Sequence, residues 1–211
     1  MVLSKHPQDI KNIKKRASDA ISLLDGLDKS KVLELGTGIG EFLLELTEKG
    51  FDVIGIDIIP NKKLIKKGFD IRKHDLNGGL PFEDSSFDVV VALEVLEHLC
   101  NPYKMMKEIK RVLRDGGYAI ISMPNTASIF QRIGQLYEKR MDNLDIYWHH
   151  YQPSIISIRN LVSTELKIEK EIFSFSFRRL RGFDWLGKIL LKINKEAFTG
   201  CFMLKARKIK K

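Results

Sequence analysis

The sequence is poor in residues that cross-link a chain or anchor it in a membrane. It has two cysteines, Cys100 and Cys201, in 211 residues, so we expect neither a disulfide framework nor a zinc site, and a reducing cytoplasm is the default compartment. No run reaches the ~18 apolar residues of a membrane span. The first 30 residues lack the uninterrupted apolar core of a secretory signal. A Ser/His/Asp order, metal-ligand spacing and a P-loop are also missing, so no metal is expected.

The charge is basic overall and concentrated late in the chain. The formal net charge is +9, and residues 171–211 hold eleven Lys or Arg against three acids. Leu186, Ile189 and Ile193 fall on one stripe of an expected helix there, with lysines mainly on another face. Such a helix rests on an anionic partner (a membrane surface or RNA) through residues 178–211, covers a site as a lid, or packs on the core with a solvated face.

The most informative segment is a buried strand followed by a glycine turn and a helix. Residues 32–40 read Val-Leu-Glu-Leu-Gly-Thr-Gly-Ile-Gly, and residues 41–49 follow with apolar side chains at helical spacing. Glycine adopts a positive φ and carries no side chain, so such a turn brings the backbone close to a ligand. Turns of this kind bind dinucleotides, phosphates and other adenosine cofactors.

The spacing of the turn argues against a dinucleotide. In the pattern G-x-G-x-x-G the third glycine lets the helix pack on the strand, but counted from Gly36 that position is Glu41. Glu34 instead lies two residues before the first glycine. Asp57 ends the next expected strand 21 residues after Gly36, close to the ~20 typical of a carboxylate that binds a ribose diol. Asp57 suits either kind of nucleoside cofactor, and its alternative is a solvated acid in a turn.

Further periodic segments extend this unit into an α/β fold. Apolar residues at helical spacing predict a helix over about 102–114, and Gly116 and Gly117 are expected to stop it and turn the chain. The remaining strands expected from hydrophobic pattern are 68–73, 87–92, 118–123, 168–177 and 201–206.

Together these motifs resemble the class I S-adenosylmethionine (SAM)-dependent methyltransferases. Glu34 and the glycine turn resemble the family's first motif, and residues 81–99 match its "LPF-D-SFD-V" and "E-VLEH" signatures almost residue for residue. Residues 116–125 resemble its "G-G-x-x-x-x-S-x-PN" arrangement. The chain is most similar to the type-11 small-molecule enzymes and the MetW-like proteins. The resemblance implies an α/β, Rossmann-like, seven-stranded and mostly parallel sheet with helices on both faces and the last strand antiparallel.

The resemblance also implies roles for individual residues. Glu34 is expected to orient the amino end of the methionine moiety, Asp57 to bind the ribose, and Asp75 with Leu76 to contact the adenine. His98 is either a contact at the cofactor edge or a general base, since imidazole titrates near neutrality, and its alternative is a backbone-bonded histidine at a helix start. The complete set of expected cofactor contacts is Glu34, Gly36, Thr37, Gly38, Gly40, Asp57, Ile58, Asp75, Leu76, Leu93, Glu94 and His98.

Other polar residues near the expected site have open assignments. His149 and His150, in the aromatic cluster 147–151, either take a proton from the methyl acceptor or belong to an interface or core patch. Asn125 is either a ligand contact or a structural residue, and Glu97 is expected to be solvated or paired with a lysine.

We therefore expect one SAM-binding methyltransferase domain over residues 31–211, preceded by a helical segment at 1–30 that packs on it. Insertions at about 126–152 and 178–199 are expected to cover the substrate. The expected function is transfer of the SAM methyl group to an N, O or C acceptor of a small molecule by in-line displacement. The alternatives are a SAM-fold regulatory protein without catalysis, a tRNA or RNA methyltransferase, and an NAD-dependent oxidoreductase.

Overall fold

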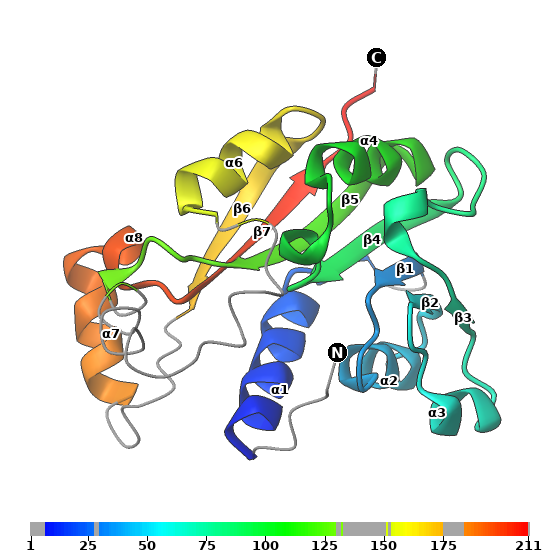
Figure 1. Cartoon of the computed structure of the whole chain (residues 1–211), viewed down its shortest axis with the longest axis horizontal. Helices are drawn as coiled ribbons and strands as arrows, with labels where there is room; N and C mark the ends of the chain where they lie inside the picture. The colour runs from blue at the N-terminus through cyan, green and yellow to red at the C-terminus, as the bar shows by residue number, and fades with distance from the viewer. Residues whose placement is uncertain are drawn as a thin grey trace.

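The computed structural model describes residues 7–27, 30–129, 132, 151, 153–174 and 184–210, which form a seven-stranded sheet with helices on both sides (Figure 1). The strand order is β3-β2-β1-β4-β5-β7-β6, and β7 runs antiparallel to both β5 and β6. This confirms the predicted Rossmann-like sheet with its antiparallel last strand. The strands are β1 (Lys31–Leu35), β2 (Asp52–Asp57), β3 (Ile71–Lys73), β4 (Phe87–Leu93), β5 (Leu113–Pro124), β6 (Lys167–Ser174) and β7 (Cys201–Arg207).

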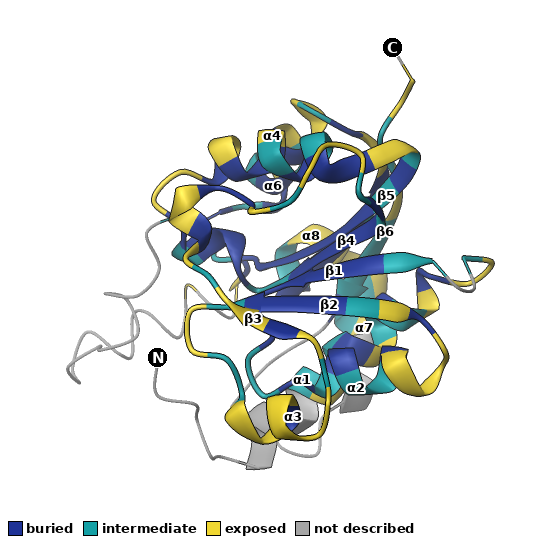
Figure 2. Cartoon of the chain, turned by 90° about the vertical axis from the view of Figure 1, so that its right-hand side faces the viewer, coloured by how far each residue is buried: buried dark blue, intermediate teal, exposed yellow. Residues whose placement is uncertain are grey.

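Helices form one layer on each face of the sheet. In Figures 1 and 2, α4 and α6 lie over one face, and α1 and α2 lie under the other. Two short 3₁₀ turns follow β3 and β4. The helical elements are α1 (Pro7–Ser22), α2 (Glu41–Glu48), α3 (Lys62–Lys66), η1 (Leu76–Gly78), η2 (Leu96–His98), α4 (Pro102–Val112), α6 (Ile155–Ser163), α7 (Asp184–Ile193) and α8 (Lys195–Phe198).

The central strands are mostly apolar because each contributes to two cores. Val89 and Val91 of β4 belong to the cluster that contains residues of α1 and α2, whereas Val90 and Ala92 belong to the cluster with α4 and α6. Figure 2 shows the middle of the sheet buried between these layers. A continuous apolar run is therefore typical of this position, as in other parallel sheets covered on both faces.

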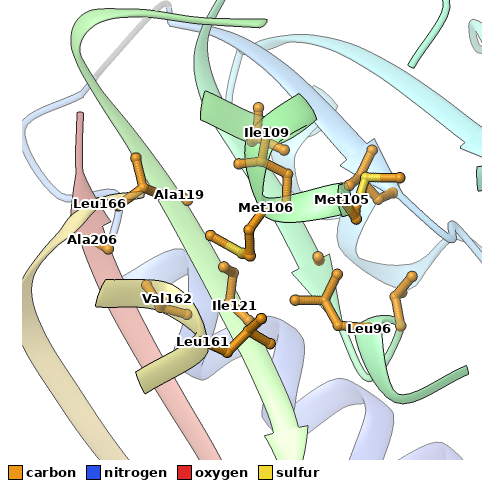
Figure 3. Packing of buried hydrophobic residues seen from close by; sticks show 14 of the residues in the cluster. Leu96, Met105, Met106, Ile109, Ala119, Ile121, Leu161, Val162, Leu166 and Ala206 are labelled. Atoms are coloured by element: carbon orange, nitrogen blue, oxygen red, sulfur yellow. The ribbon is translucent and has the colours of Figure 1, made fainter. Parts of the chain in front are cut away.

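Helix α4 starts at a capped end and buries one stripe. The side chain of Asn101 accepts a hydrogen bond from the backbone N–H of Lys104 at 3.0 Å, which satisfies one of the free donors of the first turn. Met106 and Ile109 are fully buried and pack toward Ile121 of β5 (Figure 3). The cap and the stripe place α4 over β4 and β5.

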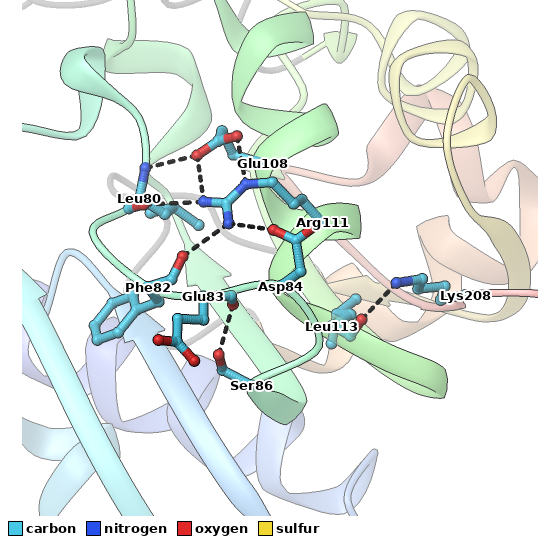
Figure 4. A network of polar contacts seen from close by, with 9 residues as sticks. All are labelled: Leu80, Phe82, Glu83, Asp84, Ser86, Glu108, Arg111, Leu113 and Lys208. Carbon is cyan, nitrogen blue, oxygen red and sulfur yellow. Dashed lines mark hydrogen bonds and ion pairs between the residues drawn. The ribbon is translucent and has the colours of Figure 1, made fainter.

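Arg111, in the last turn of α4, fastens the loop that precedes β4 (Figure 4). Its guanidinium donates to both carboxylate oxygens of Glu108 at 2.9 and 2.8 Å and to Asp84 at 2.8 Å. It also donates to the carbonyls of Leu80 at 3.0 Å and Phe82 at 2.7 Å. The hydrogen bonds from Arg111 lower the pKa of Glu108 to about 2.

The prediction that Gly116 and Gly117 stop the preceding helix is wrong. α4 ends at Val112 and β5 begins with the next residue, so both glycines lie inside β5. The register with β4 shifts there, and the left-handed φ of 80° at Gly116 accommodates the resulting bulge. The N–H of Gly116 donates to the carbonyl of Lys208 at 3.0 Å, which joins the bulge to the chain after β7.

The helix predicted around residues 186–193 is present as α7. Two of its isoleucines face outward, with Ile189 at 45% and Ile193 at 72% exposure, so its apolar stripe is not wholly covered. Among the described residues, no helix is long and apolar enough to cross a bilayer.

Candidate functional site

The turn after β1 has a backbone geometry that glycine adopts at little cost. The φ angles are 72° at Gly36, 51° at Gly38 and 87° at Gly40. A Cβ added at Gly36 would lie 2.7 Å from Cγ2 of Val95, and one added at Gly40 would collide with Leu64. Gly38 has nothing within 4 Å of the same position. The turn is thus packed at its two ends and open at its middle glycine.

Glu34 is a buried acid with an unused oxygen. It is 4% exposed on β1, and its Oε2 has no hydrogen-bond partner among the described residues. Burial, and next the charge of Asp57, raise the pKa of Glu34 well above its ordinary value. A cationic amino group satisfies such an oxygen and favours the charged carboxylate, so Glu34 fits the amino end of SAM. Thr37 in the turn has a buried hydroxyl that is likewise unpartnered.

Asp57 connects the end of β2 to the glycine turn. Its Oδ2 accepts a hydrogen bond from the N–H of Gly38 at 2.9 Å, and its Oδ1 accepts one from Ile59 at 2.8 Å. A carboxylate has about four lone-pair sites, so Asp57 can keep both bonds and still accept from ribose hydroxyls. Ile58, beside it, is 56% exposed and offers an apolar surface at the same edge.

Asp75 and Leu76 follow β3 at this edge of the sheet. Oδ1 of Asp75 accepts from the backbone and side-chain N–H groups of Asn77, at 3.0 and 3.1 Å, and so caps η1. Oδ2 of Asp75 would therefore make the predicted contact with the adenine. Leu76 is 9% exposed and belongs to the core cluster under α4.

The chain turns sharply at Glu94, after β4. Its φ of 56° is uncommon for a residue other than glycine, and strained backbone of this kind is enriched at active sites and ligand clamps. Oε1 of Glu94 accepts from Ser122 Oγ of β5 at 3.3 Å and from Cys201 Sγ of β7 at 3.2 Å. Leu93, just before it, is half-buried and pairs with Ser122 in the sheet. The motif "S-x-PN" contains Ser122, but no local signal in the sequence points to Cys201, because the contact joins distant parts of the chain.

Glu97 is buried, and the prediction that it is solvated or paired with a lysine is wrong. It is 1% exposed, and its Oε2 has no partner among the described residues. Its backbone carbonyl accepts from the N–H of Tyr151 at 3.1 Å, which joins η2 to the chain at residue 151. Burial, and next the charge of Glu94, raise the pKa of Glu97 well above its ordinary value. His98 follows, half-buried, with its backbone N–H bonded to Val95.

Asn125 has a structural role. It is 1% exposed, and its side-chain N–H₂ donates to the carbonyls of Glu196 at 2.9 Å and Thr199 at 3.0 Å. Its amide thus ties the end of β5 to α8. His149 and His150 lie outside the described residues.

Two further features of the described residues bear on the site. They contain no group of three or more side chains arranged to hold a metal ion. A hollow of about 390 Å³ lies between the start of β5, the start of β6 and the end of β7, and Lys167 and Arg207 line it. It is at the opposite edge of the sheet from the glycine turn, so it is separate from the residues above.

The comparisons with known proteins agree with this geometry. A family model described as a methyltransferase domain matches residues 9–165. A sterol 4-C-methyltransferase of Caenorhabditis elegans is 37% identical over 98 residues, which cover 42% of this chain and 29% of that protein. An uncharacterized protein of Methanocaldococcus jannaschii is 34% identical over 132 residues, covering 62% of this chain and 60% of the relative. The chain thus spans less than two-thirds of the length of either relative.

Solved structures share the fold over nearly the whole chain. A SAM-dependent methyltransferase of Archaeoglobus fulgidus superposes with a TM-score of 0.64 at 20% identity, covering 94% of both chains. One of Mesorhizobium loti gives 0.64 at 14% identity, covering 90% of this chain and 96% of the other. The predicted cofactor, SAM, is confirmed at the level of the family. With the family model matching most of the sequence, this chain belongs to the class I SAM-dependent methyltransferases.

Proposed function

We propose that this protein transfers the methyl group of SAM to an N, O or C atom of a small-molecule acceptor. The observation that carries the proposal is the buried carboxyl of Glu34, two residues before the glycine turn, whose Oε2 has no partner among the described residues. It lies toward the carboxyl end of β1, and ligands of open α/β sheets bind outside that end of the strands.

SAM supplies a methyl group that is already electrophilic, so the chain has to hold the reactants in line and exclude water. In this proposal Glu34 accepts hydrogen bonds from the amino group and Asp57 from the ribose. Asp75 and Leu76 border the adenine, with Ile58 across from them. The turn from Gly36 through Thr37 and Gly38 to Gly40 contributes backbone, and Leu93, Glu94 and His98 line the methionine end.

A general base is needed only where the acceptor carries a proton. His98 is our candidate within the described residues, since it follows β4 directly and is half-buried. His149 and His150 are proposed as alternatives from the segment after β5.

The basic segment 178–211 is proposed to meet an anionic membrane surface. The supporting observation is α7, where Ile189 and Ile193 are exposed near the exposed Lys192, and Lys195 at the start of α8 is exposed as well. Exposed apolar side chains flanked by lysines are typical of helices that lie in a lipid interface. Binding to RNA in place of anionic vesicles would contradict this part of the proposal.

The test is calorimetric titration with SAM, S-adenosylhomocysteine and NAD, followed by incubation with SAM that carries a deuterated methyl group. We expect binding of the first two ligands, no binding of NAD, and a deuterated product in cell extract. Binding of NAD without SAM would overturn the proposal. Binding of SAM without any methylated product would favour a regulatory protein of the same fold.

A further inference from the structure

Two carboxyl groups lie together at the end of β4. Glu94 follows the strand directly, and its Oε1 accepts from Ser122, near the end of β5, and from Cys201, at the start of β7. Glu97 follows in η2. The left-handed backbone at Glu94, with φ 56°, turns the chain so that both acids fall within this short segment.

Glu97, Glu94 and Cys201 lie close enough for their charges to act on one another. Burial, and next the charge of Glu94, raise the pKa of both Glu97 and the Cys201 thiol, whose Sγ lies 3.2 Å from Oε1 of Glu94. Arg16 of α1 is the cation that acts on both Glu97 and Cys201. Two acids and a thiol from the ends of neighbouring strands thus lie near one guanidinium, and one of the acids is buried.

One oxygen of this pair of acids is buried without a partner among the described residues. Glu97 is 1% exposed, and its Oε2 has no hydrogen bond among the described residues. A buried carboxylate without a donor is unfavourable, and a cation that brings N–H groups relieves that cost. Glu97 is not among the residues predicted to hold SAM, so its free oxygen calls for a second ligand.

We propose that Glu94 and Glu97 form the methyl-acceptor subsite and that the acceptor is a cationic amine. The inference rests on the proposed methyl transfer and names its substrate class. An ammonium group donates one N–H to the unpartnered oxygen of Glu97 and another to Glu94. β4 lies next to β1, which carries Glu34, so the subsite borders the methionine end of the cofactor site.

The chemical step balances with these groups. The ammonium gives one proton to the carboxylate of Glu97, which exposes the nitrogen lone pair. The nitrogen–carbon bond then forms while the carbon–sulfur bond breaks, and the bonding electron pair stays on sulfur. The positive charge thereby passes from sulfur to nitrogen, and Glu97 releases its proton to solvent when the product leaves.

The test uses the small-molecule extract of the source cells, separated at pH 7 on ion exchangers into cationic, neutral and anionic fractions. Each fraction is incubated with the full chain and SAM that carries a deuterated methyl group, and mass spectrometry detects the products. We expect deuterated products from the cationic fraction, with the label on nitrogen. Products confined to the neutral or anionic fractions would overturn the subsite and leave the methyltransferase proposal intact.

Matched variants separate the subsite from the fold and the cofactor site. Glu97→Gln is expected to lower labelling of the cationic fraction by about tenfold or more, while the Kd of SAM stays unchanged. Glu94→Gln is expected to lower labelling by a similar factor at a SAM concentration that saturates the variant, because Glu94 also borders the methionine end of the cofactor site. Glu97→Gln is also expected to remove the acid limb of the pH–rate profile. Glu83→Gln, at an exposed position in the loop before β4, is the control and should label like the parent protein.

Each remaining outcome has a definite meaning. Undiminished labelling by both glutamine variants would overturn the proposal. If Glu97→Gln does not fold, the Glu94→Gln variant and the parent's pH profile decide in its place. Failure to bind SAM would refute the proposed function itself, and binding of SAM with no labelled fraction would refute methyl transfer and the subsite together.

Discussion

Replacing Glu34 by glutamine should stabilise the ligand-free protein and weaken its cofactor binding. The carboxyl is 4% exposed with one oxygen unpartnered, and its pKa lies well above the ordinary value of 4.5. Above pH 4.5 the unfolded chain therefore releases a proton that the folded chain keeps. The free energy of unfolding of the parent protein should fall as pH rises, until the folded carboxyl also ionises.

Linkage gives the size of the effect. The slope is about 1.4 kcal/mol per pH unit over the interval between the ordinary and the raised pKa. Glutamine has the shape of a protonated glutamate but does not ionise. The free energies of unfolding of the two proteins should therefore be equal near pH 4.5. By pH 8 the variant should be more stable by about 1–3 kcal/mol, the usual cost of an unsatisfied buried polar group.

Urea unfolding of the ligand-free proteins at several pH values, followed by circular dichroism, measures this difference. The Glu83→Gln variant, exposed in the loop before β4, is the control and should show no gain that depends on pH. In calorimetric titration Glu34→Gln should bind SAM about tenfold more weakly or worse, because a charge-assisted hydrogen bond is lost. A variant that is less stable at pH 8, or whose gain does not change with pH, would refute the reasoning.

Three other predictions concern the glycine turn after β1, the hydrogen bonds of Arg111 on α4, and the two thiols. Both Gly36→Ala and Gly38→Ala place alanine in a left-handed conformation, which costs ~1–2 kcal/mol. Gly36→Ala should lower the free energy of unfolding by more, because its Cβ would also clash with Val95. Arg111→Ala should cost about 1–3 kcal/mol in urea unfolding. That difference should shrink as pH falls from 4.5 toward 2, because its carboxylate partner, with a pKa lowered to about 2, becomes protonated. In the folded protein Cys100 should react with a thiol reagent, whereas Cys201 should react only after unfolding.

Specific results would contradict each of these. Equal losses for the two glycine variants would mean that the clash at the first position is relieved by movement of Val95. A pH-independent effect of Arg111→Ala would mean that the arginine acts through packing. Two reactive thiols in the native state would mean that β7 opens at its start.

The glycine turn and most of the strands were predictable because local pattern decides them, whereas the seven-stranded sheet was predicted from the resemblance to the methyltransferases. The apolar run in β4 indicates a strand covered on both faces, and the glycine spacing after β1 by itself argues against a dinucleotide. Asp57 was predictable for the same reason, since the distance along the chain from the turn to the end of the next strand is set by one intervening helix.

The errors arise where distant contacts decide. Gly116 is a common helix stop, but here a hydrogen bond to the chain after β7 holds it in a strand bulge. Glu97 is charged and was therefore expected to be solvated or paired with a lysine. It is buried instead, and its carbonyl accepts a hydrogen bond from the N–H of Tyr151, which is distant in the sequence. The role of Asn125 was left open by the sequence for the same reason: it follows β5 at the ligand edge, but its amide donates to the carbonyls of Glu196 and Thr199. These contacts join residues that are far apart in the chain, so the pattern of residues within a short segment does not predict them.

The bridge between β2 and the glycine turn affects the thermodynamics of cofactor binding. Asp57 joins Gly38 to Ile59, and the side chain of Asn61 donates to the carbonyl of Ile39, so both loops are fixed to each other in the free protein. A ligand that enters a pre-organised cradle has little backbone to order. We therefore expect SAM to bind with only a small loss of conformational entropy. Removal of the Asp57 or the Asn61 hydrogen bond should make this entropy change more unfavourable before it affects other terms of binding.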